Sequence, residues 1–188
     1  EFFIKNNIPT ANYSYHRSLS NLDVTDLVFP CVWKKTKFGY DGYGVKILKS
    51  EKDLENLPES EFIIEEMIPF EKELATTIAR NERGEIEIFP IVEMMFNEIS
   101  NQVEFVICPA QIDDILIEKA KQVALSVSNS FKQVGLLAVE MFLTKSGEIL
   151  VNEVAPRPHN SAHYSIENCI NSQFDQHIRS ILNLPLGE

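Results

Sequence analysis

The strongest hydrophobic pattern in the chain runs from residue 113 to residue 134 and has the period of an α-helix. Apolar side chains recur there three or four positions apart, so they share one face of a helix. They are Leu116, Ala120, Val123, Ala124, Val127, Phe131 and Val134. Asp113 and Asp114 suit the N-terminal end of this helix, and Gly135 suits the position just after its last turn.

Most other apolar stretches are short and either continuous or alternating, which is typical of β-strands. The predicted strands cover residues 31–34, 45–48, 62–68, 72–80, 85–93, 103–108, 136–143 and 149–154. Tight turns at 81–84 and 144–147 join consecutive strands, and such short connections favour antiparallel pairing. The pattern therefore predicts an α+β fold with largely antiparallel sheets.

Three shorter helices are also predicted. Residues 2–5 end one, and a capping box of Ser50 and Asp53 opens another that runs to about residue 57. The last covers residues 172–182. We expect its apolar side chains to point inward; these are Phe174, Ile178, Ile181 and Leu182.

Composition and charge narrow the classes of function. A chain of 188 residues can bury a core, as one domain or as two lobes. The net charge of -11 argues against a nucleic-acid surface, but a few local Lys and Arg side chains can still hold a nucleotide. No apolar run approaches the roughly 18–20 residues of a membrane span. The three cysteines lie far apart, which predicts buried thiols in reducing, cytosolic surroundings.

Residues 34–44, K-K-T-K-F-G-Y-D-G-Y-G, form a glycine-rich loop between two predicted strands. Backbone amides in such a loop can approach phosphate oxygens closely, and Lys34 adds positive charge. The spacing matches neither a Walker loop nor G-x-G-x-x-G before a helix. Two interpretations stay open, a plain hairpin turn or a flap over phosphates.

Two glutamates sit on neighbouring predicted strands. Glu140 has apolar neighbours, and Glu153 lies on the next strand across the turn at 144–147, so the two can face each other. Facing carboxylates repel unless a cation lies between them, and Mg²⁺ prefers oxygen ligands such as these and Asn152. The alternative is a pair of exposed edge positions.

A second set of carboxylates follows the strand at 62–68. Free backbone groups at residues 66–68 can pair with the edge of an adenine, and Glu73 can accept hydrogen bonds from ribose hydroxyls. The alternative for Glu65, Glu66 and Glu73 is a set of solvated surface charges.

A dense polar stretch follows the last predicted strand. Pro156 and Pro158 stiffen the chain around Arg157, whose guanidinium suits a phosphate or bicarbonate. His159 and His163 have neither cysteine partners nor the spacing of a zinc motif.

Together these segments resemble the ATP-grasp superfamily and, within it, the 5-(carboxyamino)imidazole ribonucleotide synthases of purine biosynthesis. The resemblance extends over essentially all 188 residues and rests on four segments in the family's order. They are K-K-T-K-F-G-Y-D-G-Y-G, I-I-E-E-M-I-P-F-E-K-E-L, N-E-V-A-P-R-P-H-N-S-A-H-Y and S-Q-F-D-Q-H-I-R-S-I. The chain departs from the family's usual residues at Phe38, Val45, Phe96 and Ala162.

The resemblance implies an ATP-grasp fold of two α+β lobes with the nucleotide between them. The small lobe with the glycine flap would be residues 1–68, and the large lobe with the metal and substrate loop would be residues 69–188. The family's flanking N- and C-terminal domains would be absent. The first residues also read as the end of a helix already under way, so we expect a piece of a longer protein.

The resemblance also implies a role for each candidate residue. ATP phosphates would be held by Lys34, Gly39, Gly42, Gly44 and Asn152. Adenine and ribose would be held by Glu65, Glu66, Met67, Ile68 and Glu73. Mg²⁺, or Mn²⁺ in its place, would be held by Glu140 and Glu153. The substrates would face Arg157, His159, Asn160 and Ser161, with Tyr40 and Asp41 reaching them from the flap.

The implied reaction is carboxylation of 5-aminoimidazole ribonucleotide with bicarbonate through carboxyphosphate, driven by ATP with Mg²⁺. Its products are 5-(carboxyamino)imidazole ribonucleotide, ADP and phosphate. The resemblance implies a cytoplasmic ligase, a homodimer at full length, that binds neither nucleic acid nor membrane; the fragment alone is expected to be weak or inactive. Alternatives are another ATP-grasp carboxylase, a formate-dependent purine transformylase, or a non-catalytic nucleotide-binding module.

Overall fold

The structure is a computed structural model that describes residues 1–38, 44–97 and 102–187. The chain forms two compact units, and each is described by itself. The larger unit comprises Glu1–Thr10, Phe70–Asn97 and the chain from Val103 onward, and the smaller one is built mainly from Ala11–Pro69.

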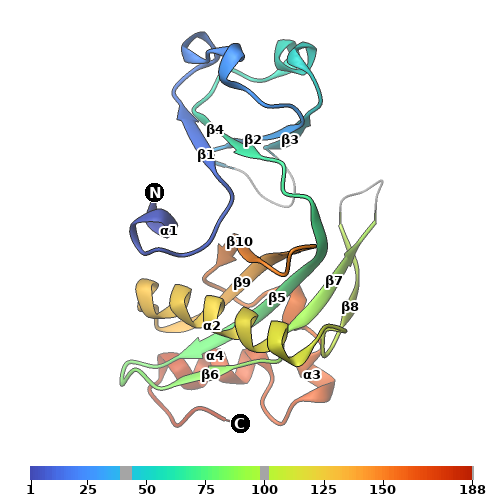
Figure 1. Ribbon diagram of the computed structural model, residues 1–188. Coiled ribbons are helices and arrows are strands. Elements are labelled where there is room, and N and C mark those ends of the chain that lie inside the picture. The colour runs from blue at the N-terminus through green and yellow to red at the C-terminus, as the bar shows by residue number, and fades with distance from the viewer. Residues whose placement is uncertain (39–43, 98–101, 188) are drawn as a thin grey trace. The chain divides into compact units, whose positions relative to one another are not determined.

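The smaller unit is a four-stranded antiparallel sheet with the strand order β1-β4-β2-β3 (Figure 1). Its strands are β1 (Tyr13–His16), β2 (Cys31–Lys35), β3 (Val45–Leu48) and β4 (Phe62–Glu66). Three 3-10 helices connect them: η1 (Leu19–Asn21), η2 (Val24–Asp26) and η3 (Glu51–Asn56). The predicted capping box of Ser50 and Asp53 is present at the start of η3. A small core of Cys31, Trp33, Leu48, Leu57, Phe62 and Ile64 covers one face of the sheet.

The larger unit is a six-stranded antiparallel sheet with the order β10-β9-β5-β7-β8, and β6 pairs with β5. Its strands are β5 (Phe70–Arg80), β6 (Ile86–Ile88), β7 (Val92–Phe96), β8 (Val103–Ile107), β9 (Gly135–Thr144) and β10 (Ile149–Ala155). The helices are α1 (Phe2–Lys5), α2 (Asp114–Phe131), α3 (Ser165–Asn168) and α4 (Gln173–Ile181), with a 3-10 turn η4 (Asn160–Ala162). Helices α2 and α4 lie on opposite faces of this sheet (Figure 1). None of the helices in the described residues has the length and apolar character that crossing a bilayer requires.

The long helix α2 confirms the strongest sequence pattern. Ala120, Ala124 and Val127 are fully buried and pack into one core with Leu137 and Val139 of strand β9. Burial of this stripe stabilises the helix, because tertiary packing supplies most of the stability of helices of this length.

The predicted strand at 85–93 is wrong as a single element. Strands β6 and β7 both pair with β5, but Phe89, Pro90 and Ile91 separate them. Pro90 has no N–H to donate to a sheet, which explains the break.

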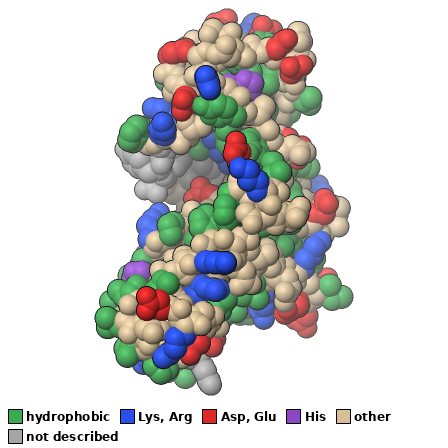
Figure 2. Space-filling view, turned by 90° about the vertical axis from the view of Figure 1, so that its left-hand side faces the viewer, with side chains coloured by type: hydrophobic (Ala, Val, Ile, Leu, Met, Phe, Trp, Pro, Cys, Tyr) green, Lys and Arg blue, Asp and Glu red, His purple; other side chains and the backbone are tan. Residues whose placement is uncertain are grey.

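The predicted inward face of the last helix is also wrong. Phe174, Ile178, Ile181 and Leu182 are 44–62% exposed, and Figure 2 shows hydrophobic side chains at the surface of the lower part of the molecule. The buried side chains of α4 are polar instead; they are Gln173, Gln176 and Ser180. Each of them has a hydrogen-bond partner, which removes the usual cost of burying a polar group.

Gly135 does not end helix α2 as predicted. Lys132 takes the left-handed conformation there, with a φ of 53°, and its N–H donates to the carbonyl of Ser128. Gly135 instead begins β9 with a φ of +105°, and a Cβ at this position would lie 3.0 Å from the ring of His177. Glycine is needed at this position for strand β9, and the helix end does not depend on it.

The predicted division between residues 68 and 69 lies one residue before the change of unit at Phe70. The first ten residues, however, pack with the larger unit and so do not belong to the small lobe. Ile8 is buried in the larger core, and the N–H of Val151 donates to the carbonyl of Pro9 at 2.8 Å. These contacts hold the N-terminal segment against the edge strand β10.

Candidate active site

The predicted site residues fall in both units, and each group is described within its own unit. Lys34, Gly44 and residues 65–68 belong to the smaller unit, and the candidates from Glu73 to Ser161 belong to the larger one. Gly39, Tyr40, Asp41 and Gly42 lie outside the described residues.

In the smaller unit, Lys34 and Glu65 form a salt bridge with 2.6 Å between Nζ and Oε2. Glu65 lies opposite Val32 in the sheet, so it shares a face with Val32 and Lys34. Cys31 and Trp33 point to the other face, into the core. Alternation along β2 therefore presents Lys34 and Glu65 together on the face that the core leaves uncovered.

The end of strand β4 is held by the segment that enters the smaller unit. The N–H of Glu66 donates to the carbonyl of Asn12 at 3.0 Å, and the Asn12 side chain donates to the Glu66 carboxylate at 2.9 Å. Met67 is partly exposed, whereas Ile68 is buried. Gly44 has a φ of 85°, and its carbonyl accepts from the N–H of Lys35 at 2.8 Å at the base of the glycine loop.

In the larger unit, a β-bulge places the two candidate metal ligands opposite each other. Val151 pairs with Met141, but Glu153 pairs with Glu140, so Asn152 is an extra residue in strand β10. Without the bulge Glu153 would oppose Val139, whose side chain lies in the core. The predicted meeting of Glu140 and Glu153 is confirmed, and the bulge is its cause.

Glu73 of strand β5 belongs to the same group of carboxylates. Burial, and after it the nearby negative charge of Glu153, together raise the pKa of Glu73 to about 7. Glu73 lies opposite Phe142 in strand β9, two residues from Glu140 and on the same face. This face of the sheet thus holds three glutamates.

His159 is buried against one of these glutamates. Its Nε2 lies 3.3 Å from the Oε1 of Glu140. Its Nδ1 accepts from the backbone N–H of Ser161 at 3.4 Å and lies 2.9 Å from the Ser161 hydroxyl. Because a backbone N–H can only donate, the ring proton of neutral His159 sits on Nε2 and points to Glu140. Ser161 is buried behind His159, so its side chain supports the histidine.

Arg157 and Asn160 are exposed on the same polar stretch. Within the described residues Arg157 forms no ion pair, and its Nη1 donates to the carbonyl of Pro158 at 3.0 Å. A guanidinium without a carboxylate neighbour keeps its donors available for an anionic ligand.

The donor set fits a divalent cation that is shared with a phosphate. Glu140 and Glu153 offer facing carboxylate oxygens, which are the ligands that Mg²⁺ prefers. No group of three or more His, Cys, Asp or Glu side chains in the described residues is arranged to hold a metal by itself. A cation at this site would therefore complete its coordination with water and ligand oxygens.

Gln173 was not among the residues predicted to have a role in the site. This residue is 0% exposed, and its amide contacts the backbone of His159. The sequence does contain a pattern that indicates a polar face on this helix, because polar residues recur at helical spacing at positions 173, 176 and 180.

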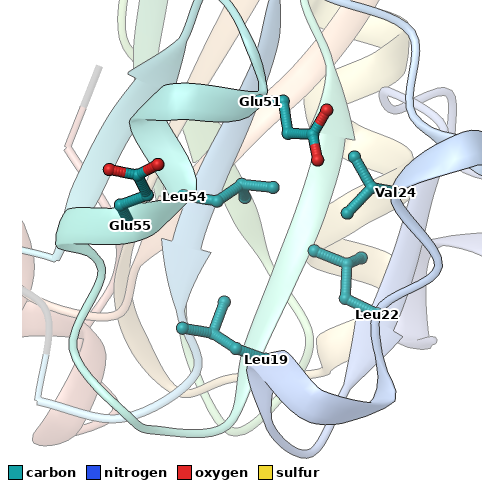
Figure 3. Close-up of a pocket in the computed structure, with 6 residues that line it drawn as sticks. All are labelled: Leu19, Leu22, Val24, Glu51, Leu54 and Glu55. Atoms are coloured by element: carbon teal, nitrogen blue, oxygen red, sulfur yellow. The ribbon is translucent and has the colours of Figure 1, made fainter.

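One hollow of the smaller unit lies apart from the predicted site residues. A shallow pocket of about 290 Å³ lies in the smaller unit between η1, η2 and η3 (Figure 3). Its lining contains none of the predicted site residues; it consists of Leu19, Leu22, Val24, Glu51, Leu54 and Glu55. All three leucines of this lining also pack against the smaller core, so the pocket is a gap at the edge of that core.

Fold and site together define the class of protein. The ATP-grasp domain matches residues 1–174, and the chain belongs to the ATP-grasp family. The chain is 40% identical over 185 residues to the N5-carboxyaminoimidazole ribonucleotide synthase of Bacillus subtilis, covering 95% of this chain and 48% of that protein. The chain thus spans about half the length of this curated relative.

Solved structures show the same similarity. The N5-carboxyaminoimidazole ribonucleotide synthetase of Thermotoga maritima matches with a TM-score of 0.87 and 49% identity, over 100% of this chain and 48% of that one. The N5-carboxyaminoimidazole synthase of Aspergillus clavatus, in complex with ADP and 5-aminoimidazole ribonucleotide, matches with a TM-score of 0.85 and 30% identity. That match covers 99% of this chain and 50% of the Aspergillus chain.

Proposed function

We propose that this chain is the ATP-grasp part of a ligase that carboxylates 5-aminoimidazole ribonucleotide with bicarbonate. The reaction consumes ATP and gives 5-(carboxyamino)imidazole ribonucleotide, ADP and phosphate. The names of the relatives support this reaction, and one of their structures holds ADP and 5-aminoimidazole ribonucleotide.

The observation that carries the proposal is the bulged pair of Glu153 and Glu140 beside Glu73. Three carboxylates on one sheet face repel one another, and a structural role would favour apolar or neutral side chains there. Mg²⁺ held by Glu140 and Glu153 would neutralise this charge and the phosphate charge that develops during phosphoryl transfer.

The reaction has two steps. A bicarbonate oxygen attacks the γ-phosphorus of ATP, the bond to the β–γ bridging oxygen breaks, and ADP leaves. The exocyclic amine of the ribonucleotide then attacks the carboxyl carbon of carboxyphosphate, phosphate leaves, and the nitrogen loses a proton. We assign Arg157 to the anionic intermediate because its guanidinium is exposed and has no carboxylate partner in the described residues.

The remaining candidates have supporting roles in this proposal. Lys34 binds phosphate oxygens, with Glu65 as its counter-charge in the structure without ligand. Residues 65–68 and Glu73 bind the nucleoside, and Asn152 binds the phosphates. His159 orients Glu140, and Asn160 contacts substrate.

The test measures phosphate release by the full-length protein that contains this chain, with Mg·ATP and bicarbonate, and with and without 5-aminoimidazole ribonucleotide. We expect release that depends on the ribonucleotide, and we expect Glu153→Gln to abolish it, since an amide cannot supply the second negative ligand. Glu148→Gln, an exposed change on the same hairpin, is the control and should leave release unchanged. Release that is stimulated by formate instead of bicarbonate and the ribonucleotide would contradict the proposal.

The proposal also includes Mg²⁺ as the activating cation, with Mn²⁺ able to replace it, and a homodimer in the cytoplasm. The activating cation is tested by removing metal with a chelator and measuring phosphate release after Mg²⁺ or Mn²⁺ is added back. The homodimer is tested by the molar mass from size-exclusion chromatography with light scattering.

A further inference from the structure

We propose that Gln173 is the positioning residue that holds His159 against Glu140. Gln173 is the first residue of helix α4, and its side chain is 0% exposed. Only the kinetic part of the test rests on the proposed function, because the contacts of Gln173 are properties of the fold.

The amide of Gln173 binds both backbone groups of His159. Its Oε1 accepts from the N–H of His159 at 2.8 Å, and its Nε2 donates to the carbonyl of His159 at 2.9 Å. These two bonds fix the orientation of the amide, since a backbone N–H only donates and a carbonyl only accepts. One buried side chain therefore sets the position and the rotation of the peptide groups on both sides of His159.

The same amide reaches a second histidine. Its Nε2 lies 2.9 Å from the Nδ1 of His163, and the orientation set by His159 makes this contact a donation to His163. The backbone N–H of Gln173 donates to the hydroxyl of Ser165 at 2.9 Å, which in turn donates to the carbonyl of Ala162 at 2.6 Å. The start of α4 thus fastens the polar loop at three points, His159, Ala162 and His163.

This fastening reaches the candidate metal ligand through His159. The backbone of His159 is held by Gln173, and its ring lies between the Ser161 hydroxyl and the Glu140 carboxylate. A carboxylate that holds a metal needs a fixed orientation, and hydrogen-bonding neighbours outside the ligand set supply it. Gln173 contributes to that orientation without contacting Glu140 itself.

Gln176 on the same helix offers a matched control. It is also buried, and its amide makes the same kind of two-point contact with a backbone, at Gly187. Gly187 is not among the candidate site residues. Replacing Gln176 therefore removes a comparable pair of hydrogen bonds without touching the loop of His159.

The experiment compares Gln173→Met and Gln176→Met, which keep most of the side-chain volume and remove the amide. Ribonucleotide-dependent phosphate release at saturating ATP should fall about tenfold or more in Gln173→Met, with a smaller change in the KM for ATP. Gln176→Met should lower the melting temperature similarly but keep the rate. If the methionine variants do not fold, Gln173→Glu and Gln176→Glu replace them in the same comparison. A glutamate at 173 can still accept from the N–H of His159, but when ionised it cannot donate to the His159 carbonyl.

A second readout does not depend on the reaction. Nitrogen-15 NMR of labelled histidines should show a slowly exchanging Nε2–H for the buried ring of His159 in the wild-type protein and in Gln176→Met. In Gln173→Met this signal should exchange faster or disappear. An unchanged signal, or equal losses of rate in both variants at matched stability, would overturn the proposal. Full-length wild-type protein without ribonucleotide-dependent release would instead contradict the proposed function, and the NMR comparison would still decide the role of Gln173.

Discussion

Glu73 shows how a single side chain connects the site to the stability of the fold. Its carboxyl is largely removed from water and lies near the charge of Glu153, and its pKa is raised to about 7. In the unfolded chain the group titrates near its ordinary value of 4.5. Between these two values the folded state binds more protons than the unfolded state, so this group makes stability fall as pH rises.

We therefore predict that Glu73→Gln flattens the pH dependence of unfolding. In the wild-type protein, without metal, the contribution of Glu73 should make the free energy of unfolding fall between about pH 4.5 and pH 7 and level off above pH 7. The variant cannot ionise at this position, so that loss should be smaller. Urea unfolding across this pH range measures it. The control Glu71→Gln changes an exposed carboxylate two residues away and should reproduce the wild-type slope.

Among the candidate residues, the sequence predicted that Glu140 and Glu153 can face each other across the turn at 144–147, but it did not predict the bulge at Asn152 that brings them opposite each other. It did not predict the desolvation of Glu73 or the burial of Ser161. Both depend on how the polar loop folds back against the sheet, and no local pattern in the sequence contains that information.

At the scale of elements, helix α4 has its apolar face outside. We predict that Ile178→Ala changes the free energy of unfolding by only about 0.5 kcal/mol, because that side chain is half exposed. Ile78→Ala removes a fully buried side chain of the larger core and should cost about 2–5 kcal/mol. Urea denaturation of both variants measures the difference. Equal losses would mean that α4 buries its apolar face in solution.

Strand β9 begins with a glycine for two separable reasons. We predict that Gly135→Ala destabilises more than Gly84→Ala, although both alanines would adopt a positive φ at a cost of about 1–3 kcal/mol. A Cβ at 84 has no neighbour closer than 3.6 Å, whereas one at 135 lies 3.0 Å from the His177 ring. In a double-mutant cycle, combining Gly135→Ala with His177→Ala should recover the stability that Gly135→Ala loses beyond the loss caused by Gly84→Ala. A coupling energy near zero would assign the whole cost to the backbone.

Periodicity was sufficient to predict helix α2, whose apolar stripe is also its buried stripe, and most of the strands. It did not predict strand β1 (Tyr13–His16), and it joined β6 and β7 into one element. It failed for α4 because a period shows that a helix has two unlike faces without showing which one is buried. Gln173 and Gln176 are buried because backbone groups outside the helix, at His159 and Gly187, satisfy their amides. Those partners become visible only once the chain is folded.

For the whole molecule, the division into two compact units, each with its own buried core, predicts two unfolding transitions. Trp33, the only tryptophan, lies in the smaller core, while helix α2 and the long strands β5 and β9 belong to the larger unit. The smaller core contains fewer buried side chains and should melt first. Trp fluorescence should therefore change at a lower urea concentration than far-UV circular dichroism. Coincident curves would show that the units unfold together.

The family could be predicted from the sequence because its motifs are local strings of residues. The membership of the first ten residues could not, since Ile8 and Pro9 join the larger unit through contacts with residues far along the chain. Long-range contacts of this kind are not encoded in a short window.

The bulge at Asn152 has a consequence for how this gene region can change. Any substitution at position 152 preserves the spacing that brings Glu153 opposite Glu140. Loss of the codon for Asn152 would remove the extra residue and leave Glu153 directly after Val151, still opposite Glu140 in a regular ladder. The pairing of the two glutamates is therefore expected to survive both substitution and deletion at position 152, and a variant that lacks Asn152 separates the role of its side chain from that of the register.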